Sequence, residues 1–193
     1  MKNLIYIHGK GGSAAESEHY RNIFPDFEVI GFDYKAENPW DAKAEFQKFF
    51  NHRGKVVIIA NSIGAFFAMH ALSDKFIERA IFISPIVDME NLILGMMRQA
   101  NITEEILRER REIENLSWKY LCYVRENPIA WNVPTDILYG ENDALTSLET
   151  ITAFSKKIGA TLTVMAGGEH WFHTPEQMAF LDNWLRQRSV KKC

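Results

Sequence analysis

The chain has 193 residues, of which 47% are hydrophobic, and its formal net charge is −3 at pH 7. A chain of this length can bury enough apolar surface to fold as one globular domain without a metal or a disulfide. The modest charge, with Lys and Arg residues scattered along the chain, argues against a nucleic-acid-binding protein and against a polybasic membrane surface.

The cysteines and the N-terminal residues give an indication of the cellular compartment. Two cysteines, Cys122 and Cys193, do not make a disulfide framework, which favours a reducing environment. The apolar run at residues 4–7 is too short for the core of a signal peptide, and no stretch approaches the ~20 apolar residues of a membrane-spanning helix. We therefore expect a cytoplasmic protein with no membrane span.

Strand-like and helix-like segments alternate along the chain. Six apolar runs, several of them continuous rather than alternating, predict strands covered on both faces of a parallel sheet; they occupy residues 4–7, 28–32, 55–60, 79–84, 136–139 and 160–165. Helical patterns occupy residues 40–51, 62–72, 147–158 and 175–188. This order predicts a doubly wound α/β domain over residues 1–193, with right-handed crossovers.

Residues 86–131 break the alternation. No strand is predicted there, and residues 103–112 have a strongly helical pattern. One narrow apolar face is expected from Ile102, Ile106, Ile113 and Leu116. The segment is too short to hold a core of its own, so we expect a helical insertion rather than a second domain.

A serine follows the third predicted strand. The pattern Ala60-Asn61-Ser62-Ile63-Gly64 lies between a buried strand and a helix. A serine on such a sharp strand-to-helix turn needs small residues two positions before and two positions after it, and Ala60 and Gly64 are both small. The amide of Ile63 would then point at a substrate from the helix N-terminus. The alternative is that Ser62 only caps the helix.

A carboxylate and a histidine follow the last two predicted strands. Asp143 lies in the loop after residues 136–139, where an ordinary turn aspartate is the alternative and Glu141 is the rival acid. His170 lies in the glycine-rich loop after residues 160–165, with His173 as the rival histidine. The order serine, acid, histidine distinguishes the chain from chymotrypsin-like and subtilisin-like proteases.

A glycine-rich turn follows the first predicted strand. It reads His8-Gly9-Lys10-Gly11-Gly12-Ser13. A phosphate-binding loop is the competing interpretation, but the required spacing Gly-x-x-x-x-Gly-Lys-Ser/Thr is absent.

Taken in this order, the motifs resemble those of the α/β-hydrolase superfamily. The serine pattern is similar to its nucleophile elbow, Gly-x-Ser-x-Gly, with alanine in place of the first glycine. The resemblance implies that Ser62 is the nucleophile, that His170 is the base and that Asp143 orients it. It also implies an oxyanion hole formed by the backbone N–H groups of Ile63 and Lys10.

The resemblance spans nearly the whole chain and carries expectations about fold and cofactors. It implies a mostly parallel sheet of about six strands with helices on both faces, but without the two leading antiparallel strands of larger relatives. No metal and no organic cofactor are implied.

The implied activity is hydrolysis of a small carboxylic ester or thioester through an acyl-enzyme intermediate. Because this fold hosts many reactions, two alternatives stay open. One is a hydrolase of carbon–carbon bonds that uses the same triad, and the other is a non-catalytic binding protein. The expected partner is a small ester-like molecule, and no pattern in the sequence indicates an oligomeric state.

The insertion leaves the sheet at the edge where Ser62 is expected. Residues 86–131 could therefore form a short helical lid, with Met96 and Met97 in an apolar substrate pocket beside Trp171. The equally weighted alternative is that the apolar residues only pack the insertion onto the core.

Overall fold

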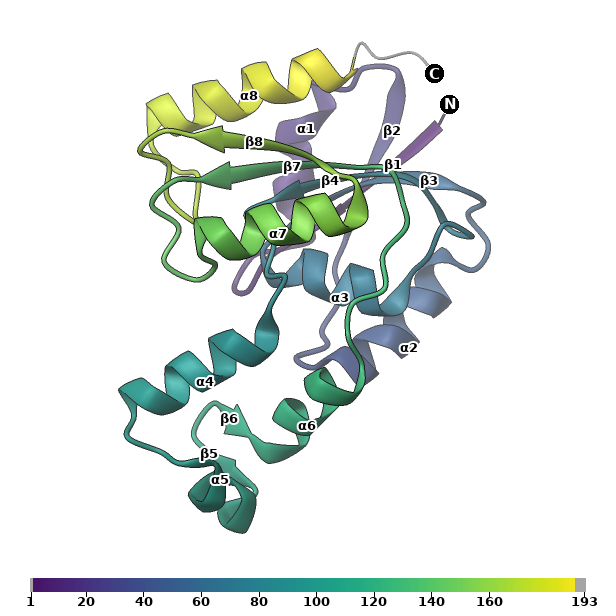
Figure 1. Cartoon of the computed structure of the whole chain (residues 1–193). Coiled ribbons are helices and arrows are strands. Elements are labelled where there is room, and N and C mark those ends of the chain that lie inside the picture. The colour runs from purple at the N-terminus through teal and green to yellow at the C-terminus, as the bar shows by residue number, and fades with distance from the viewer. Residues whose placement is uncertain (1, 190–193) are drawn as a thin grey trace.

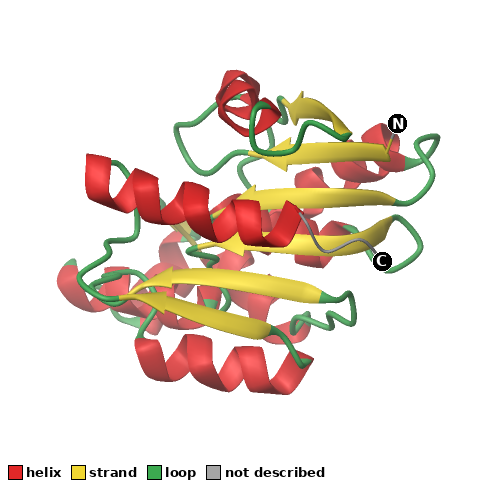
Figure 2. Cartoon of the chain, turned by 90° about the horizontal axis from the view of Figure 1, so that it is seen from above, coloured by secondary structure: helices red, strands yellow, loops and turns green. Residues whose placement is uncertain are grey.

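A six-stranded parallel sheet forms the centre of the molecule. The structure, a computed structural model, describes residues 2–189, so Cys193 lies outside the described residues. The strands lie side by side in the order β2-β1-β3-β4-β7-β8 (Figures 1 and 2). Their bounds are β1 Lys2–Ile7, β2 Phe27–Phe32, β3 Val56–Asn61, β4 Ile77–Ile83, β7 Thr135–Gly140 and β8 Thr161–Met165. All neighbouring pairs in this sheet are parallel, which puts their carboxyl ends at one edge.

Helices cover both faces of the sheet (Figure 1). A short 3₁₀ helix (Ala14–Ser17), α1 (Glu18–Arg21) and α8 (Pro175–Ser189) lie on one face. The other face carries α2 (Pro39–Phe50), α3 (Ile63–Ala71) and α7 (Leu148–Ile158). All six predicted strands and all four predicted helices are present, with bounds that differ by at most two residues.

Alternate residues of each buried strand point to opposite faces, which explains why the apolar runs are continuous. Ile5 and Ile7 of β1 lie in the core beneath α2 and α3, whereas Leu4 and Tyr6 pack on the face of α1 and α8. Both faces are covered, so successive positions are buried, as at residues 4–7 of β1 and 56–60 of β3. We call these the α3 face and the α8 face.

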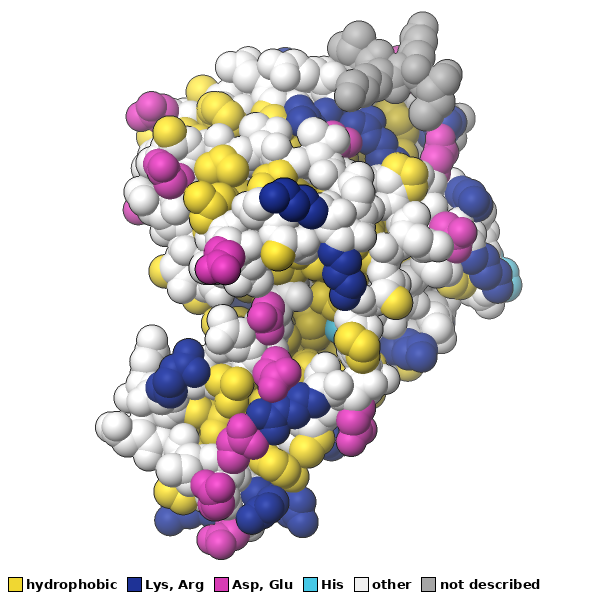
Figure 3. Space-filling view, in the orientation of Figure 1, with side chains coloured by type: hydrophobic (Ala, Val, Ile, Leu, Met, Phe, Trp, Pro, Cys, Tyr) yellow, Lys and Arg dark blue, Asp and Glu magenta, His cyan; other side chains and the backbone are white. Residues whose placement is uncertain are grey.

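The insertion folds into three helices and a small hairpin. Its elements are α4 (Met89–Gln99), α5 (Glu104–Arg110), β5 (Glu112–Ile113), β6 (Leu116–Ser117) and α6 (Trp118–Glu126). The expectation of no strand was wrong, because β5 and β6 pair antiparallel. The guanidinium of Arg125 bonds Glu90 of α4 and Glu104 of α5, which ties the three helices together. Figure 3 shows the surface hollowed where this lobe meets the body of the molecule.

The expected single apolar face of this segment was also wrong. The helix ends at Arg110, because Arg111 takes the left-handed backbone conformation with φ 68°. Ile113 and Leu116 therefore pair with each other across the hairpin instead of continuing a helix. Ile106 is 39% exposed, and the buried residue of α5 is Leu107.

Candidate active site

Ser62 sits on a strained turn between β3 and α3. Its backbone has φ 51° and ψ −122°, a region that non-glycine residues rarely adopt. Three backbone hydrogen bonds hold this conformation. The Ser62 N–H donates to Ile83 O at 3.0 Å, and Ser62 O accepts the N–H groups of Ala65 and Ile86, each at 3.2 Å. The serine side chain makes no capping bond to α3, unlike an ordinary N-cap serine. Its hydroxyl is therefore directed away from the helix.

Glycines allow this turn to pass close to the loop after β1. A Cβ at Gly64 would lie 2.3 Å from His8 O, so any other residue there would collide with backbone. A Cβ at Gly9 would lie 3.3 Å from the Cβ of Ser62. The serine turn and the glycine-rich loop are thus in direct contact, as the steric argument from the sequence requires.

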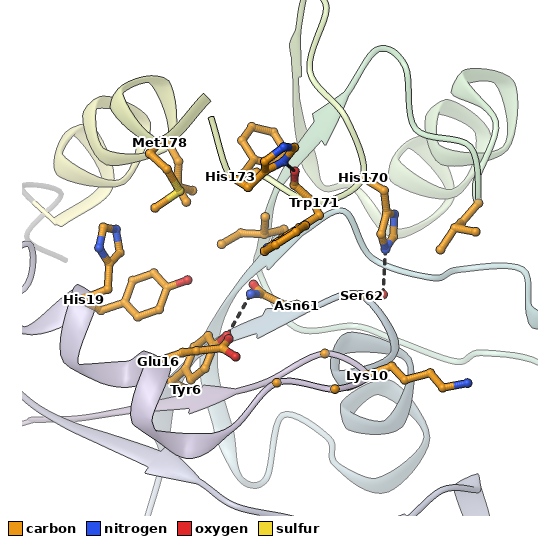
Figure 4. Close-up of a pocket in the computed structure, with 18 residues that line it drawn as sticks. Tyr6, Lys10, Glu16, His19, Asn61, Ser62, His170, Trp171, His173 and Met178 are labelled. Atoms are coloured by element: carbon orange, nitrogen blue, oxygen red, sulfur yellow. Dashed lines mark hydrogen bonds between the residues drawn. The ribbon is translucent and has the colours of Figure 1, made fainter. Parts of the chain in front are cut away.

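Ser62, His170 and Asp143 form one hydrogen-bonded chain. Ser62 Oγ lies 2.8 Å from His170 Nε2 (Figure 4), and His170 Nδ1 lies 2.7 Å from Asp143 Oδ2. The Asp143 side chain is fully buried. Its other oxygen, Oδ1, accepts the backbone N–H groups of Leu145 at 2.8 Å and Thr146 at 3.1 Å. Three donors therefore fix the carboxylate, and the carboxylate in turn orients the imidazole.

The two loops that carry the acid and the histidine are held against each other. The Asn142 N–H donates to Gly168 O at 2.7 Å, and the Glu141 N–H donates to Met165 O at 3.0 Å. A Cβ at Gly140 would lie 2.4 Å from Glu169 O. Glycine at the end of β7 is thus what lets the loops approach closely enough for the Asp143–His170 bond.

The rival acid and the rival histidine have other contacts. The Glu141 carboxylate accepts the Gly167 N–H at 2.9 Å. It therefore stabilises the histidine loop and is not part of the hydrogen-bonded series Ser62–His170–Asp143. His173 Nδ1 lies 2.8 Å from Trp171 O, and the His173 ring stacks on the Trp171 ring with centroids 4.8 Å apart. The hydrogen-bond partner of the Ser62 hydroxyl is His170.

Two backbone N–H groups beside Ser62 are available to a ligand. Ile63 is the first residue of α3, and Lys10 lies in a tight turn closed by a 3.2 Å bond from Gly12 N to Gly9 O. Within residues 2–189, neither of the two N–H groups donates a hydrogen bond to a protein atom. The Lys10 side chain points away from the cavity (Figure 4).

A cavity of about 870 Å³ opens beside Ser62 and His170 on the α8 face. Part of its wall is apolar, formed by Ile83, Leu145, Phe172, Met178 and Leu181. Trp171 lines it from the rim, where it is 73% exposed. No residue of the insertion is among the described residues that line it. Met97 is instead buried in the core of the α3 face, and Met96 packs against that core.

The polar end of this cavity was not foreseen from the sequence. It contains Tyr6 of β1, Asn61 of β3 and Glu16 of the 3₁₀ helix. The Asn61 amide donates to the Tyr6 hydroxyl at 2.9 Å, and that hydroxyl bonds the Glu16 carboxylate (Figure 4). The one local signal is Ser13-Ala14-Ala15-Glu16, a capping box, which predicts a helix start rather than a binding site.

A second, smaller cavity lies between α3, α4, α6 and α7. Its volume is about 210 Å³, and His70, Asp88 and Lys157 are among its lining residues. Burial lowers the pKa of His70 to about 4, with a smaller contribution from Lys43. This histidine is therefore neutral at physiological pH and stands apart from the chain of three.

Comparisons with known proteins identify the fold. Est1E from Butyrivibrio proteoclasticus superposes with a TM-score of 0.70 at 17% identity, covering 99% of this chain and 89% of that one. A monoacylglycerol lipase from Paleococcus ferrophilus gives a TM-score of 0.69 at 16% identity, covering 97% of this chain and 93% of that one. No family model and no curated sequence matches the chain.

The structural neighbours cover nearly the whole chain and include esterases and a lipase. The protein therefore has the α/β-hydrolase fold. At these identities the likeness speaks for the fold alone, and the chemistry has to be argued from the site. Within residues 2–189 no helix combines the length and the hydropathy needed to cross a bilayer.

Proposed function

We propose that the protein is a serine hydrolase that cleaves a small carboxylic ester or thioester. The observation that carries this proposal is the chain Asp143–His170–Ser62, with spacings of 2.7 and 2.8 Å. A buried carboxylate on Nδ1 holds the imidazole in the tautomer whose Nε2 can accept the serine proton. A strained backbone at Ser62 supports the proposal, because such strain concentrates at functional sites.

The proposed reaction proceeds in two steps. His170 Nε2 takes the proton from Ser62 Oγ while the oxygen attacks the ester carbonyl, and the protonated imidazole then donates that proton to the departing alcohol or thiol. Water, deprotonated by the same nitrogen, attacks the acyl-enzyme. The bond between the acyl carbon and Ser62 Oγ breaks, His170 returns the proton to Ser62 Oγ, and the carboxylic acid leaves. The N–H groups of Ile63 and Lys10 are the proposed donors to the oxyanion in each step.

The substrate is proposed to occupy the cavity on the α8 face. Leu145 and Trp171 are exposed apolar side chains at the rim, which supports binding of an apolar part of the substrate there. Met96 and Met97 have no part in this proposal, because they do not line the cavity.

The test is turnover of nitrophenyl esters of graded chain length by purified protein. Ser62→Ala should lower kcat by about 10⁴ to 10⁶, because loss of the nucleophile leaves only binding and the oxyanion donors. Ser73→Ala, at an exposed serine just beyond α3, is the matched control and should retain full activity. Activity of Ser62→Ala within tenfold of wild type would refute the proposal, provided that circular dichroism shows a folded protein.

A further inference from the structure

The polar end of the cavity holds a carboxylate whose partners are neutral. Glu16 Oε1 accepts the Ser13 N–H at 3.0 Å, and Oε2 accepts the Tyr6 hydroxyl. Among residues 2–189 Glu16 has no ion pair with a lysine, arginine or histidine. An ionised carboxylate offers about four acceptor positions, so Glu16 has capacity for a further donor.

The neighbouring Tyr6 hydroxyl already donates its proton to Glu16 and is not free to donate a hydrogen bond to a ligand. The Asn61 amide donates to Tyr6 Oη at 2.9 Å, which directs the hydroxyl proton of Tyr6 onto Glu16. Burial raises the pKa of Tyr6 well above its usual range, and the proximity of Tyr20 and Glu16 raises it further. The hydroxyl therefore stays protonated, and this end of the cavity presents negative charge.

Aromatic rings border the same carboxylate. Tyr6 and Tyr20 both line the cavity, but their rings pack on each other with centroids 4.9 Å apart and the residues are only 0% and 4% exposed. A ligand cation is therefore attracted at this end by the charge of the Glu16 carboxylate rather than by a ring face.

Other ionisable side chains of the cavity have other contacts: His19 Nε2 is engaged by Asp182 at 2.8 Å, and His173 Nδ1 lies 2.8 Å from Trp171 O. The Lys10 side chain points away (Figure 4).

We infer that the substrate carries a protonated amine that binds the carboxylate of Glu16 at the polar end of the cavity. This inference rests on the proposed function, since it places the ester carbonyl at Ser62 in the same cavity. The part of the substrate between the amine and the ester carbonyl would lie along the apolar wall that includes Ile83, Met178 and Leu181. The substrate class is thus an ester with an alkylammonium group at a distance from the scissile bond.

The test compares esters of equal size with and without the amine. Nitrophenyl 6-aminohexanoate and nitrophenyl heptanoate form the acyl-side pair, and nitrophenyl 6-hydroxyhexanoate separates charge from hydrogen bonding. For an amine in the leaving group, 2-aminoethyl butyrate is compared with propyl butyrate. Wild type should prefer the amino ester of at least one pair, mainly through a lower KM.

Glu16→Gln is the informative variant, because glutamine keeps the shape and hydrogen-bonding capacity of the side chain but removes the charge. The ratio of kcat/KM for the amino ester to kcat/KM for its neutral partner should fall by about fivefold, the upper range for an exposed ion pair. The ratio cancels any change that the substitution makes to both esters. Glu18→Gln, at a surface carboxylate that pairs with Arg21, should leave the ratio unchanged.

Three results would overturn the inference: no amino preference in either pair, an equal preference for the hydroxy ester, or a ratio that Glu16→Gln does not alter. Hexylammonium chloride provides a readout independent of catalysis. It should raise the Tm of wild type more than that of Glu16→Gln, and hexanol should not discriminate between them. If no ester is hydrolysed, the proposed function fails, and the Tm measurements with hexylammonium chloride and hexanol test the amine site independently.

Discussion

Two parts of the molecule leave the carboxyl edge of the sheet and differ in what they do there. The loops after β7 and β8 bring Asp143 and His170 to Ser62. The insertion after β4 starts equally close, since the Ile86 N–H bonds Ser62 O, but its helices then pack on the α3 face. The cavity opens on the opposite face, where residues of α1 and α8 line it.

Burial separates the two regions as clearly as position does. Met97 and Leu107 of the insertion are 3% and 0% exposed, whereas Trp171 and Leu145 at the cavity rim are 73% and 44% exposed. Apolar side chains that are buried contribute to the free energy of folding, and those left exposed beside a cavity point to a ligand. An apolar segment at the right edge of a sheet is thus not sufficient evidence for a lid.

The largest expected effect separates two histidines of the same loop. His170→Ala should lower kcat by about 10⁴ or more, as severely as loss of the serine, because among residues 2–189 His170 is the base that contacts Ser62 Oγ. His173→Ala should change kcat less than tenfold, since its ring stacks on Trp171 at the rim. Steady-state kinetics on both variants checks this, and a severe loss in His173→Ala alone would reverse the assignment.

The next effect separates two carboxylates of the preceding loop. Asp143→Asn should lower kcat by up to about 10⁴, because an amide favours the wrong tautomer of His170. Glu141→Gln should cost far less, since Glu141 only accepts the Gly167 N–H. A full loss in Glu141→Gln with an active Asp143→Asn would show that the wrong carboxylate was chosen.

The smallest effects on turnover are expected from substitutions in the insertion and at the rim of the cavity. Met97→Ala should lower the free energy of unfolding by about 2–5 kcal/mol and leave KM unchanged, because it removes buried volume away from the cavity. Trp171→Ala should change stability by about 0.5 kcal/mol or less and raise KM several-fold. Chemical denaturation and ester kinetics on both proteins measure the contrast. A KM effect of Met97→Ala that grows with acyl-chain length would restore the lid.

The serine turn could be predicted from the sequence because its demands are local. Gly64 is required because His8 O approaches it too closely for a Cβ, and the small residues around Ser62 in the sequence reflect this steric limit. Asp143 and His170 could be chosen over Glu141 and His173 because the chain order and loop positions of this fold restrict the choice.

What could not be predicted depends on contacts between distant residues or on unusual backbone. Arg111 has a positive φ, a conformation that glycine or asparagine usually adopts at the end of a helix. Because the sequence has arginine there, it does not indicate that α5 ends earlier than its helical pattern suggests. Strands of two residues, such as β5 and β6, leave no periodicity to detect. Tyr6 and Asn61 are brought together by the pairing of β1 with β3, and Glu16 reaches them from the 3₁₀ helix that follows β1.

Labelling with a fluorophosphonate tests the central claim most directly. The reagent forms a covalent bond with an activated serine oxygen and releases fluoride, so the adduct can be located by mass spectrometry of peptides. The account predicts one adduct, on Ser62, that is absent in Ser62→Ala, strongly slowed in His170→Ala and formed at the wild-type rate in His173→Ala. An unlabelled wild-type protein, or an adduct on another serine, would contradict it.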